Sequence, residues 1–338
     1  MNKTLQQILK ITLCVVLAGV LLYLAFRKVS FKDVVDILKH ANYWWLALSL
    51  SCGMLSYVCR SARWNLLIEG LGYKPKLSNT FNAVLSGYFI NNAVPRLGEI
   101  MKCVALGRKE SIPVDKLVGT MVAERTIDVL TLLAIAVALV VGASDSVNAF
   151  LRDGIFVPLQ ERIVNTFGNG WVFWTVLVLL IVLTIAILVR YKDKLSTKKV
   201  FAKFYGFCNG LWDGLKVIFS LDKKGLFLLY TILMWANYTL MTWFVVFCLP
   251  STSGLGLSDG IFLLVIGSLG MVVPVQSGFG AFHYITSRGL EYVYGIELEQ
   301  GLAYALLSHE SQILMMIIVG AIATYLIFGK KREKDPRL

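Results

Sequence analysis

Charged residues are scarce in this sequence, and the motifs of soluble enzymes are missing from it. Asp, Glu, Lys and Arg make up 16% of the 338 residues, whereas soluble domains average about 25%. There is no dinucleotide-binding glycine fingerprint, Walker loop, serine nucleophile elbow or zinc-protease motif. Hydrophobic residues make up 57%, and a soluble chain of this length could not bury that much apolar surface. We therefore expect an integral membrane protein.

Potential metal ligands are also few. The three histidines, His40, His283 and His309, are widely spaced, and the six cysteines include no CxxC pair. This spacing predicts neither a zinc site nor a disulfide framework, and we expect no metal and no cofactor. The net charge of +12 indicates basic loops that face an anionic inner leaflet rather than a nucleic-acid partner.

Six apolar runs predict membrane-spanning helices, because about 20 apolar residues cross a bilayer. They lie at residues 11–26, 43–59, 127–142, 171–189, 226–249 and 302–328. The first run follows a basic start, as in a signal peptide, but no small-residue cleavage site follows it. We expect this run to be retained as a helix.

Polar and helix-breaking residues interrupt two further apolar segments, 80–107 and 261–295. Proline breaks the helical hydrogen-bond ladder, and glycine weakens it. Backbone groups freed in hydrocarbon are costly unless protein or water satisfies them. Each segment is therefore predicted to be a hairpin of two half-helices with a polar tip buried in the protein.

Charge predicts the orientation in the cell inner (cytoplasmic) membrane, since basic loops stay in the cytoplasm. Residues 190–224 are rich in Lys and Arg, whereas 250–260 contain neither. We expect the first of these loops inside and the second outside. This places the N-terminus inside, although the basic residues in 27–42 leave the opposite orientation open.

The two halves of the chain share one predicted layout. Residues 1–170 and 171–338 each run span, span, hairpin, span, and they start on opposite sides. We expect a single multi-pass transmembrane domain, 1–338, with an all-α fold. It is a polytopic membrane helical bundle of six full spans plus two broken, re-entrant helical hairpins arranged as an inverted repeat. Broken helices at matching places indicate a substrate site in transporters.

Candidate substrate-binding residues gather at the hairpin tips and beside them. Charges at membrane depth are expensive and usually functional. Arg96 offers a planar fork that grips a phosphate through two bonds, and Lys102 adds a second cation. The predicted set is Arg60, Arg63, Asn91, Asn92, Arg96, Glu99, Lys102, Glu124, Arg125, Asp128, Gln276, Ser277, Gly278, Gly280, His283, His309 and Gln312.

Structural alternatives stand beside the binding role in the first half. Glu99 and Lys102, three residues apart, share a helical face and would form a salt bridge that only holds the hairpin. Glu124 and Asp128 share a face and would pair with Arg96 or Lys102, relay protons, or anchor and cap the start of a spanning helix at the interface. Arg63 and its neighbour Arg60 would contact a lipid headgroup or form an ordinary inner flank beside an interfacial tryptophan.

The second half leaves similar alternatives open. Gly278 and Gly280 let the backbone approach a ligand or another helix closely. Around them, Gln276 and Ser277 would satisfy a polar headgroup, and His283 would titrate. Tight packing at a helix break is the alternative. The residues His309 and Gln312 would complete a polar pocket with His283 or lie among the headgroups.

Four groups of these residues carry a resemblance to a known family. They are Arg63-Trp64 with Leu66-Leu67, Asn91…Pro95-Arg96-Leu97-Gly98-Glu99, Glu124-Arg125…Asp128, and Pro274…Gly278…Gly280. With them the chain resembles the lysylphosphatidylglycerol synthase transmembrane (flippase-like) family. The resemblance covers most of the chain, and the stretch from Pro95 to Glu99 is the most specific.

The resemblance implies movement of lipids, such as aminoacylated phospholipids or polyprenyl-linked sugars, between leaflets. The family often has Arg where Lys102 stands here. Its late motif often reads proline-x-proline-glycine-glycine and ends in glutamate, where this chain has Gln276, Ser277 and His283. No aminoacyl-transfer domain follows, so we expect the chain not to be the two-part synthase.

Three functions remain open at this point. The first is a translocator that moves a phospholipid or polyprenyl-phosphate lipid. The second is a membrane enzyme acting on a lipid headgroup, with Glu99, Asp128 or His283 as acid or base. The third is a non-catalytic partner subunit of a glycosyltransferase or synthase. Transport is favoured over catalysis, and a homo-oligomer is compatible with each.

Overall fold

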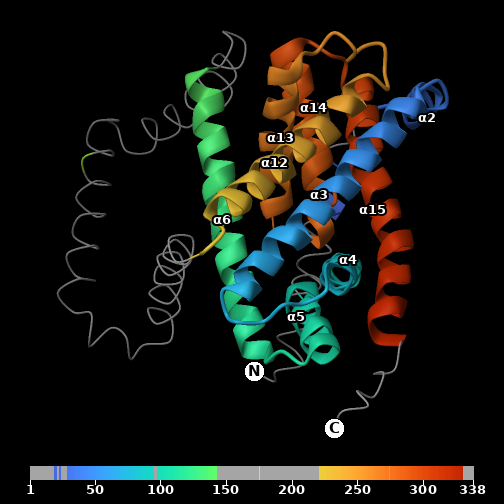
Figure 1. Cartoon of the computed structure of the whole chain (residues 1–338). Coiled ribbons are helices and arrows are strands. Elements are labelled where there is room, and N and C mark those ends of the chain that lie inside the picture. The colour runs from blue at the N-terminus through green and yellow to red at the C-terminus, as the bar shows by residue number, and fades with distance from the viewer. Residues whose placement is uncertain are drawn as a thin grey trace.

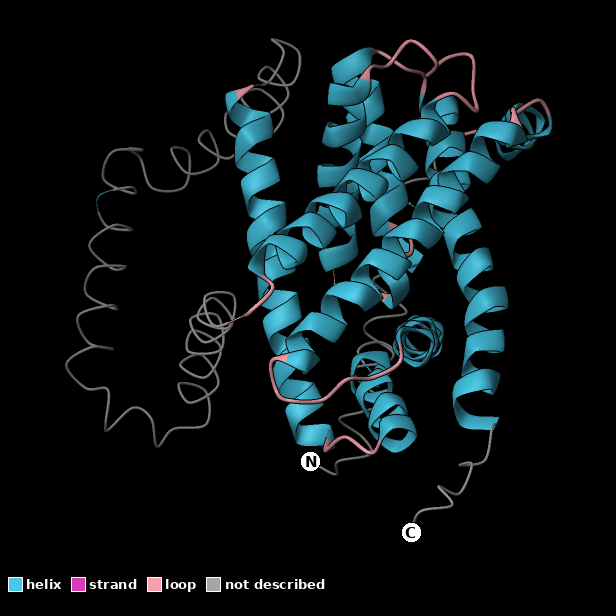
Figure 2. Cartoon of the chain, in the orientation of Figure 1, coloured by secondary structure: helices cyan, strands magenta, loops and turns pink. Residues whose placement is uncertain are grey.

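The computed structural model describes residues 29–94, 97–142, 221–273 and 275–329, together with positions 19, 20, 23 and 175. Within these residues every regular element is a helix, and no strand occurs (Figure 2). The all-α prediction is thereby confirmed for the described chain. The predicted spans at 11–26 and 171–189 lie almost wholly outside it.

The described helices follow one another with short connections. They are α2 (Phe31–Lys39), α3 (Tyr43–Glu69), α4 (Leu77–Ala93), α5 (Leu97–Glu110), α6 (Val114–Val141), α12 (Lys224–Val246), α13 (Leu257–Val272), the 3-10 turn η2 (Gln276–Gly278), α14 (Ala281–Tyr294) and α15 (Leu298–Gly329). Helices α3 and α12 pack against each other through the middle of the molecule. In Figure 1, α4 and α5 lie in the lower half and α13 and α14 in the upper half.

Among the described helices, α12 and α15 are long and apolar enough to cross a bilayer. They correspond to the predicted spans at 226–249 and 302–328. Only 28% of the most apolar 18-residue stretch of α15 is buried inside the protein. Leu314, Ile318 and Ile322 form an exposed stripe at helical spacing. An apolar face turned outward suits lipid, because water would penalise it.

The predicted spans at 43–59 and 127–142 lie within the longer helices α3 and α6. Both helices extend well beyond their apolar runs into charged sequence. They continue because charged side chains inside the protein find partners on neighbouring helices, as described below. The total of six full spans therefore stays a prediction.

The first interrupted segment forms two helices around a break, as predicted. Helix α4 ends at Ala93 and α5 begins at Leu97. The Asn91 side chain accepts a hydrogen bond of 2.8 Å from the Gly98 backbone amide, which would otherwise lack a partner in the first turn of α5. A Cβ at Gly98 would lie 1.8 Å from the Gly87 carbonyl oxygen, so only glycine allows α4 and α5 to approach this closely.

The second interrupted segment breaks in the same way. Helix α13 ends at Val272, η2 follows, and α14 begins at Ala281. Gly278 and Gly280 have φ angles of +70° and +81°, a left-handed conformation that glycine adopts without strain. Ser277 is also left-handed, at φ 48° and ψ 27°, which is uncommon for a residue with a Cβ. The break thus depends on these residues.

Three apolar clusters lie among the described helices, and the two larger ones adjoin the charged interior. One packs Phe262, Leu302 and Tyr304 between α12, α13, α14 and α15. The other surrounds Trp64 and Leu106 between α3, α5 and α6. The cores fix the helices on which the polar residues of the candidate site stand.

Candidate functional site

Charged side chains from α3, α5 and α6 form one connected network of ion pairs inside the molecule. It consists of Arg60, Arg63, Glu99, Lys102, Glu124, Arg125 and Asp128. The helical period produces it, because residues three or four apart on a helix face the same neighbour. All seven are predicted site residues, and the structure brings them together.

The innermost part of the network joins two arginines of α3 to two carboxylates of α6. Arg60 reaches Glu124 at 2.7 Å and Asp128 at 2.9 Å. Arg63 reaches Asp128 at 2.6 Å and Glu124 at 3.5 Å. Each guanidinium therefore connects both carboxylates. Arg63 and Glu124 are completely buried, and buried charges of this kind persist only when they are paired.

Lys102 of α5 joins this core to the surface. Its amine lies 3.0 Å from Glu124 and 3.1 Å from Glu99, and it sits over the Trp64 ring at 4.7 Å. The Trp64 indole in turn donates a hydrogen bond of 2.9 Å to Thr120. Lys102 is 2% exposed, so its charge is already satisfied by carboxylates of the protein.

The network reaches the surface near the first helix break. Arg125 pairs with Glu99 at 2.7 Å, and their side chains are 34% and 23% exposed. Glu99 lies in the first turn of α5, directly after the break. Across the network, four cations face three carboxylates, which leaves one positive charge in excess. Excess positive charge in a low-dielectric setting attracts an anion.

The tips of the two broken segments touch each other. Ser277 donates a hydrogen bond of 3.0 Å to the Asn92 side chain, and Gln276 donates to the Asn92 backbone carbonyl. These residues are 185 and 184 positions apart in the sequence. The predicted meeting of the two tips is therefore present in the structure.

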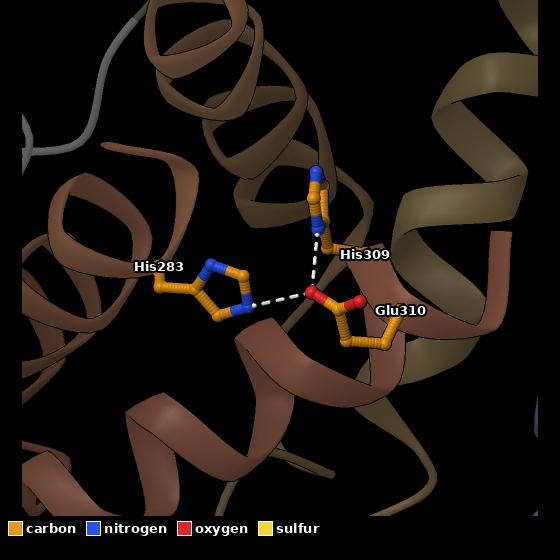
Figure 3. A group of neighbouring side chains, drawn as sticks. All are labelled: His283, His309 and Glu310. Atoms are coloured by element: carbon orange, nitrogen blue, oxygen red, sulfur yellow. Dashed lines mark hydrogen bonds and ion pairs between the residues drawn. The ribbon is translucent and has the colours of Figure 1, made fainter. Parts of the chain in front are cut away.

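A polar cluster lies behind the second tip (Figure 3). The His309 Nε2 atom is 2.8 Å from the Ser277 carbonyl oxygen. Both His309 Nδ1, at 2.9 Å, and His283 Nε2, at 3.2 Å, lie against one carboxylate oxygen of Glu310. The two histidines thus lie in one polar cluster, as one of the two interpretations from sequence expected.

Two alternatives drawn from sequence do not fit this geometry, and a third does. Arg63 and Trp64 are fully buried, so the prediction of an interfacial flank is wrong. Capping of a helix start was one alternative for the carboxylates on α6, but α6 begins at Val114, ten residues before Glu124. Capping is therefore wrong, and the buried arginines of α3 explain why the helix can carry acids in its middle. The predicted salt bridge from Glu99 is confirmed.

Other predicted residues lie apart from these clusters. Arg96 lies outside the described residues. Gln312 is half-buried on α15 and does not join the histidine cluster. His283 is completely buried behind the tip, so a headgroup at the tip does not reach it directly. Lys102 is also buried, so a headgroup at the tip does not reach it directly.

Two participants are absent from the predicted set of site residues. Glu310 completes the histidine cluster, and its adjacency to His309 in an apolar helix was the available signal. The Tyr238 hydroxyl accepts a hydrogen bond of 3.2 Å from Arg60. Tyr238 lies within an apolar run, and nothing in the local sequence marks it.

Known proteins are similar to this chain over nearly its whole length. The model of the family described as lysylphosphatidylglycerol synthase TM region matches residues 8–320. The chain is also similar to the UPF0104 membrane protein MJ1595 of Methanocaldococcus jannaschii, with 23% identity over 352 residues that cover 98% of each protein. The chain is therefore a membrane protein that belongs to the lysylphosphatidylglycerol synthase TM region family.

Proposed function

We propose that this protein moves a phosphate-bearing lipid between the leaflets of the cell inner membrane. The observation that carries the proposal is the contact between the two broken-helix tips beside a buried network with excess positive charge. A headgroup needs a polar route, because burying it in hydrocarbon without partners is costly. The tips and the exposed end of the network offer that route, while the acyl chains stay in lipid.

The phosphate would first meet the basic residues at the first tip. Arg125 is the exposed arginine of the network, and the sequence places Arg96 in the adjacent break. Arginine binds phosphate through two parallel hydrogen bonds. Lys102 and the arginines of α3 then act as positioning residues, since they hold the carboxylates that would otherwise repel an anion.

The helix arrangement supports an inverted repeat as part of the proposal. Helix α4 packs on α15, and α13 packs on α6, so each first hairpin arm contacts the last helix of the other half. In Figure 1, α6 rises through the view while α15 descends. Two hairpins that enter from opposite faces are the arrangement used for alternating access. We include six full spans in this proposal.

Passage of a headgroup requires the two tips to part. The hydrogen bonds from Gln276 and Ser277 to Asn92 close the route between them. Each bond contributes about 1 kcal/mol to stability, so the contact is weak enough to open. Ser277 stores strain in its left-handed backbone, as is common at mobile functional sites.

The experiment is a headgroup-movement assay in vesicles that contain the purified full-length protein. The probe is phosphatidylglycerol carrying a fluorescent headgroup label, and a membrane-impermeant reductant bleaches the outer leaflet. Wild-type protein is expected to expose the inner-leaflet label to bleaching. Arg96→Ala and Arg125→Ala should abolish this, because each removes a phosphate-binding fork.

Arg288→Ala is the matched control. This arginine lies on α14 and pairs with Glu291 along the same helix, away from the first tip. It should move lipid at the wild-type rate. Normal movement by the Arg96 variant would contradict the proposed role, and chemical change of the labelled lipid would indicate an enzyme instead.

A further inference from the structure

Three potential metal ligands meet behind the second tip, apart from the ion-pair network. His283 lies in the first turn of α14, and His309 and Glu310 lie on α15. Their ligand atoms all lie within 4.8 Å of one another (Figure 3). Both histidines are buried, while the Glu310 side chain is 38% exposed. This group is not apparent from the sequence, because the two histidines are 26 positions apart.

The hydrogen bonds of His309 fix the position of its proton. A carbonyl oxygen only accepts, so His309 Nε2 must donate to Ser277. In the neutral ring, Nδ1 then carries a lone pair, and this atom lies 2.9 Å from a carboxylate oxygen of Glu310. Two electron pairs repel each other at that distance unless a proton or a cation lies between them.

His283 distinguishes between a proton and a metal cation. Its Nδ1 atom makes no hydrogen bond with a described residue, and its Nε2 atom has only a 3.2 Å contact with the Glu310 oxygen that falls short of hydrogen-bond geometry, although the ring is completely buried. A second proton on His309 would occupy this oxygen and leave His283 with that contact alone, which is costly inside a protein. A cation held between His283 Nε2, His309 Nδ1 and the Glu310 oxygen would use all three atoms.

We infer that His283, His309 and Glu310 bind a divalent transition-metal ion. Ligand atoms about 2.1 Å from such an ion lie roughly 3.0–3.4 Å from one another. The distances from the Glu310 oxygen to the two ring nitrogens are 2.9 and 3.2 Å. The ligand atoms all lie within 4.8 Å of one another, so binding brings the two imidazoles closer together.

The chemistry of the donors selects the ion. Imidazole nitrogen with carboxylate oxygen suits zinc and its transition-metal neighbours, whereas magnesium and calcium prefer oxygen alone. The Ser277 carbonyl orients His309 as an outer partner, and the Phe282 ring stacks on it at 4.9 Å. The inference of a metal site does not rest on the proposed lipid movement, because it is argued from the positions of the protein's own atoms.

The test is zinc binding by the full-length protein, purified in detergent and stripped with a chelator. Titration calorimetry and elemental analysis should find one Zn²⁺ per chain. His309→Asn and Glu310→Gln should weaken binding by more than the roughly 10–100-fold cost of losing an outer partner. His40→Asn, at the exposed histidine that bonds within α2, should bind as wild type does. Equal binding by all four proteins would overturn the inference.

Zinc-edge X-ray absorption of the wild-type protein keeps the test valid if a variant fails to fold. Two imidazoles and a shell of nitrogen and oxygen at about 2.0–2.1 Å are expected. A sulfur shell near about 2.3 Å would place the ion on cysteines and overturn the inference. Failure of the wild-type protein to bind Zn²⁺ would also overturn it and leave a protonated His309 to explain the close carboxylate.

Discussion

Replacing Glu124 by glutamine should strongly destabilise the protein. This carboxylate lies 2.7 Å from Arg60 and 3.0 Å from Lys102, and it is completely buried. Glutamine keeps its size but removes its charge and turns an amide donor toward other donors. Two carboxylates would then face four cations. Breaking a buried ion pair by removing one partner costs about 3–5 kcal/mol, and we expect the free energy of unfolding to fall by that amount.

The measurement is equilibrium unfolding of the detergent-purified protein with increasing denaturant. Glu69→Gln is the matched control, because Glu69 pairs with Lys223 at 2.8 Å on the surface. That substitution should change the unfolding free energy little, since exposed pairs are screened by solvent. Equal losses from the two substitutions would refute a buried network.

A second substitution separates charge imbalance from lost packing. Lys102→Met removes one of the cations that Glu124 neutralises. Combined with Glu124→Gln, it should cost less than the sum of the two single substitutions, because the pair interacts directly. Additive costs would mean that the two side chains act independently.

Further predictions concern the helix breaks and the packing around the network. Gly98→Ala should lower the free energy of unfolding by about 1–3 kcal/mol through overpacking, because the added Cβ would collide with α4. Gly119 on α6 has open space around it, so Gly119→Ala should be tolerated or stabilising in the same unfolding assay. Ser277→Ala should weaken the contact between the tips by about 1 kcal/mol. The rate at which this variant moves lipid should change in the vesicle bleaching assay, while its circular dichroism spectrum should show that the fold is kept. Thr120→Val should cost about 1–3 kcal/mol by leaving the buried Trp64 indole without an acceptor, whereas an unchanged unfolding midpoint would contradict this.

Local features of the fold were predictable from sequence. Apolar runs predicted α12 and α15, because a helix that crosses a bilayer needs only sufficient length and an apolar composition. Proline and glycine at the interrupted segments predicted helix breaks, since proline breaks the helical hydrogen-bond ladder and glycine weakens it. The Glu99–Lys102 pair was also visible, because it follows from helical spacing alone.

The features that could not be predicted depend on partners that are distant in the sequence. The start of α6 at Val114 was hidden, because acids in a helix look like a boundary until their cationic partners are known. Those partners, Arg60 and Arg63, lie on another helix, and no local pattern links them to Glu124. The cluster of His283 and Glu310 likewise depends on how α14 packs against α15.

Reversible cross-linking of the two tips tests the central claim most directly. Cysteines at positions 92 and 277, in a background without the native cysteines, would be joined by a short cleavable thiol reagent in vesicles. These side chains are in hydrogen-bond contact, so the link should form readily. Lipid movement should stop when the tips are joined and return when the link is cleaved. Undiminished movement through the joined protein would contradict a route that opens between the tips.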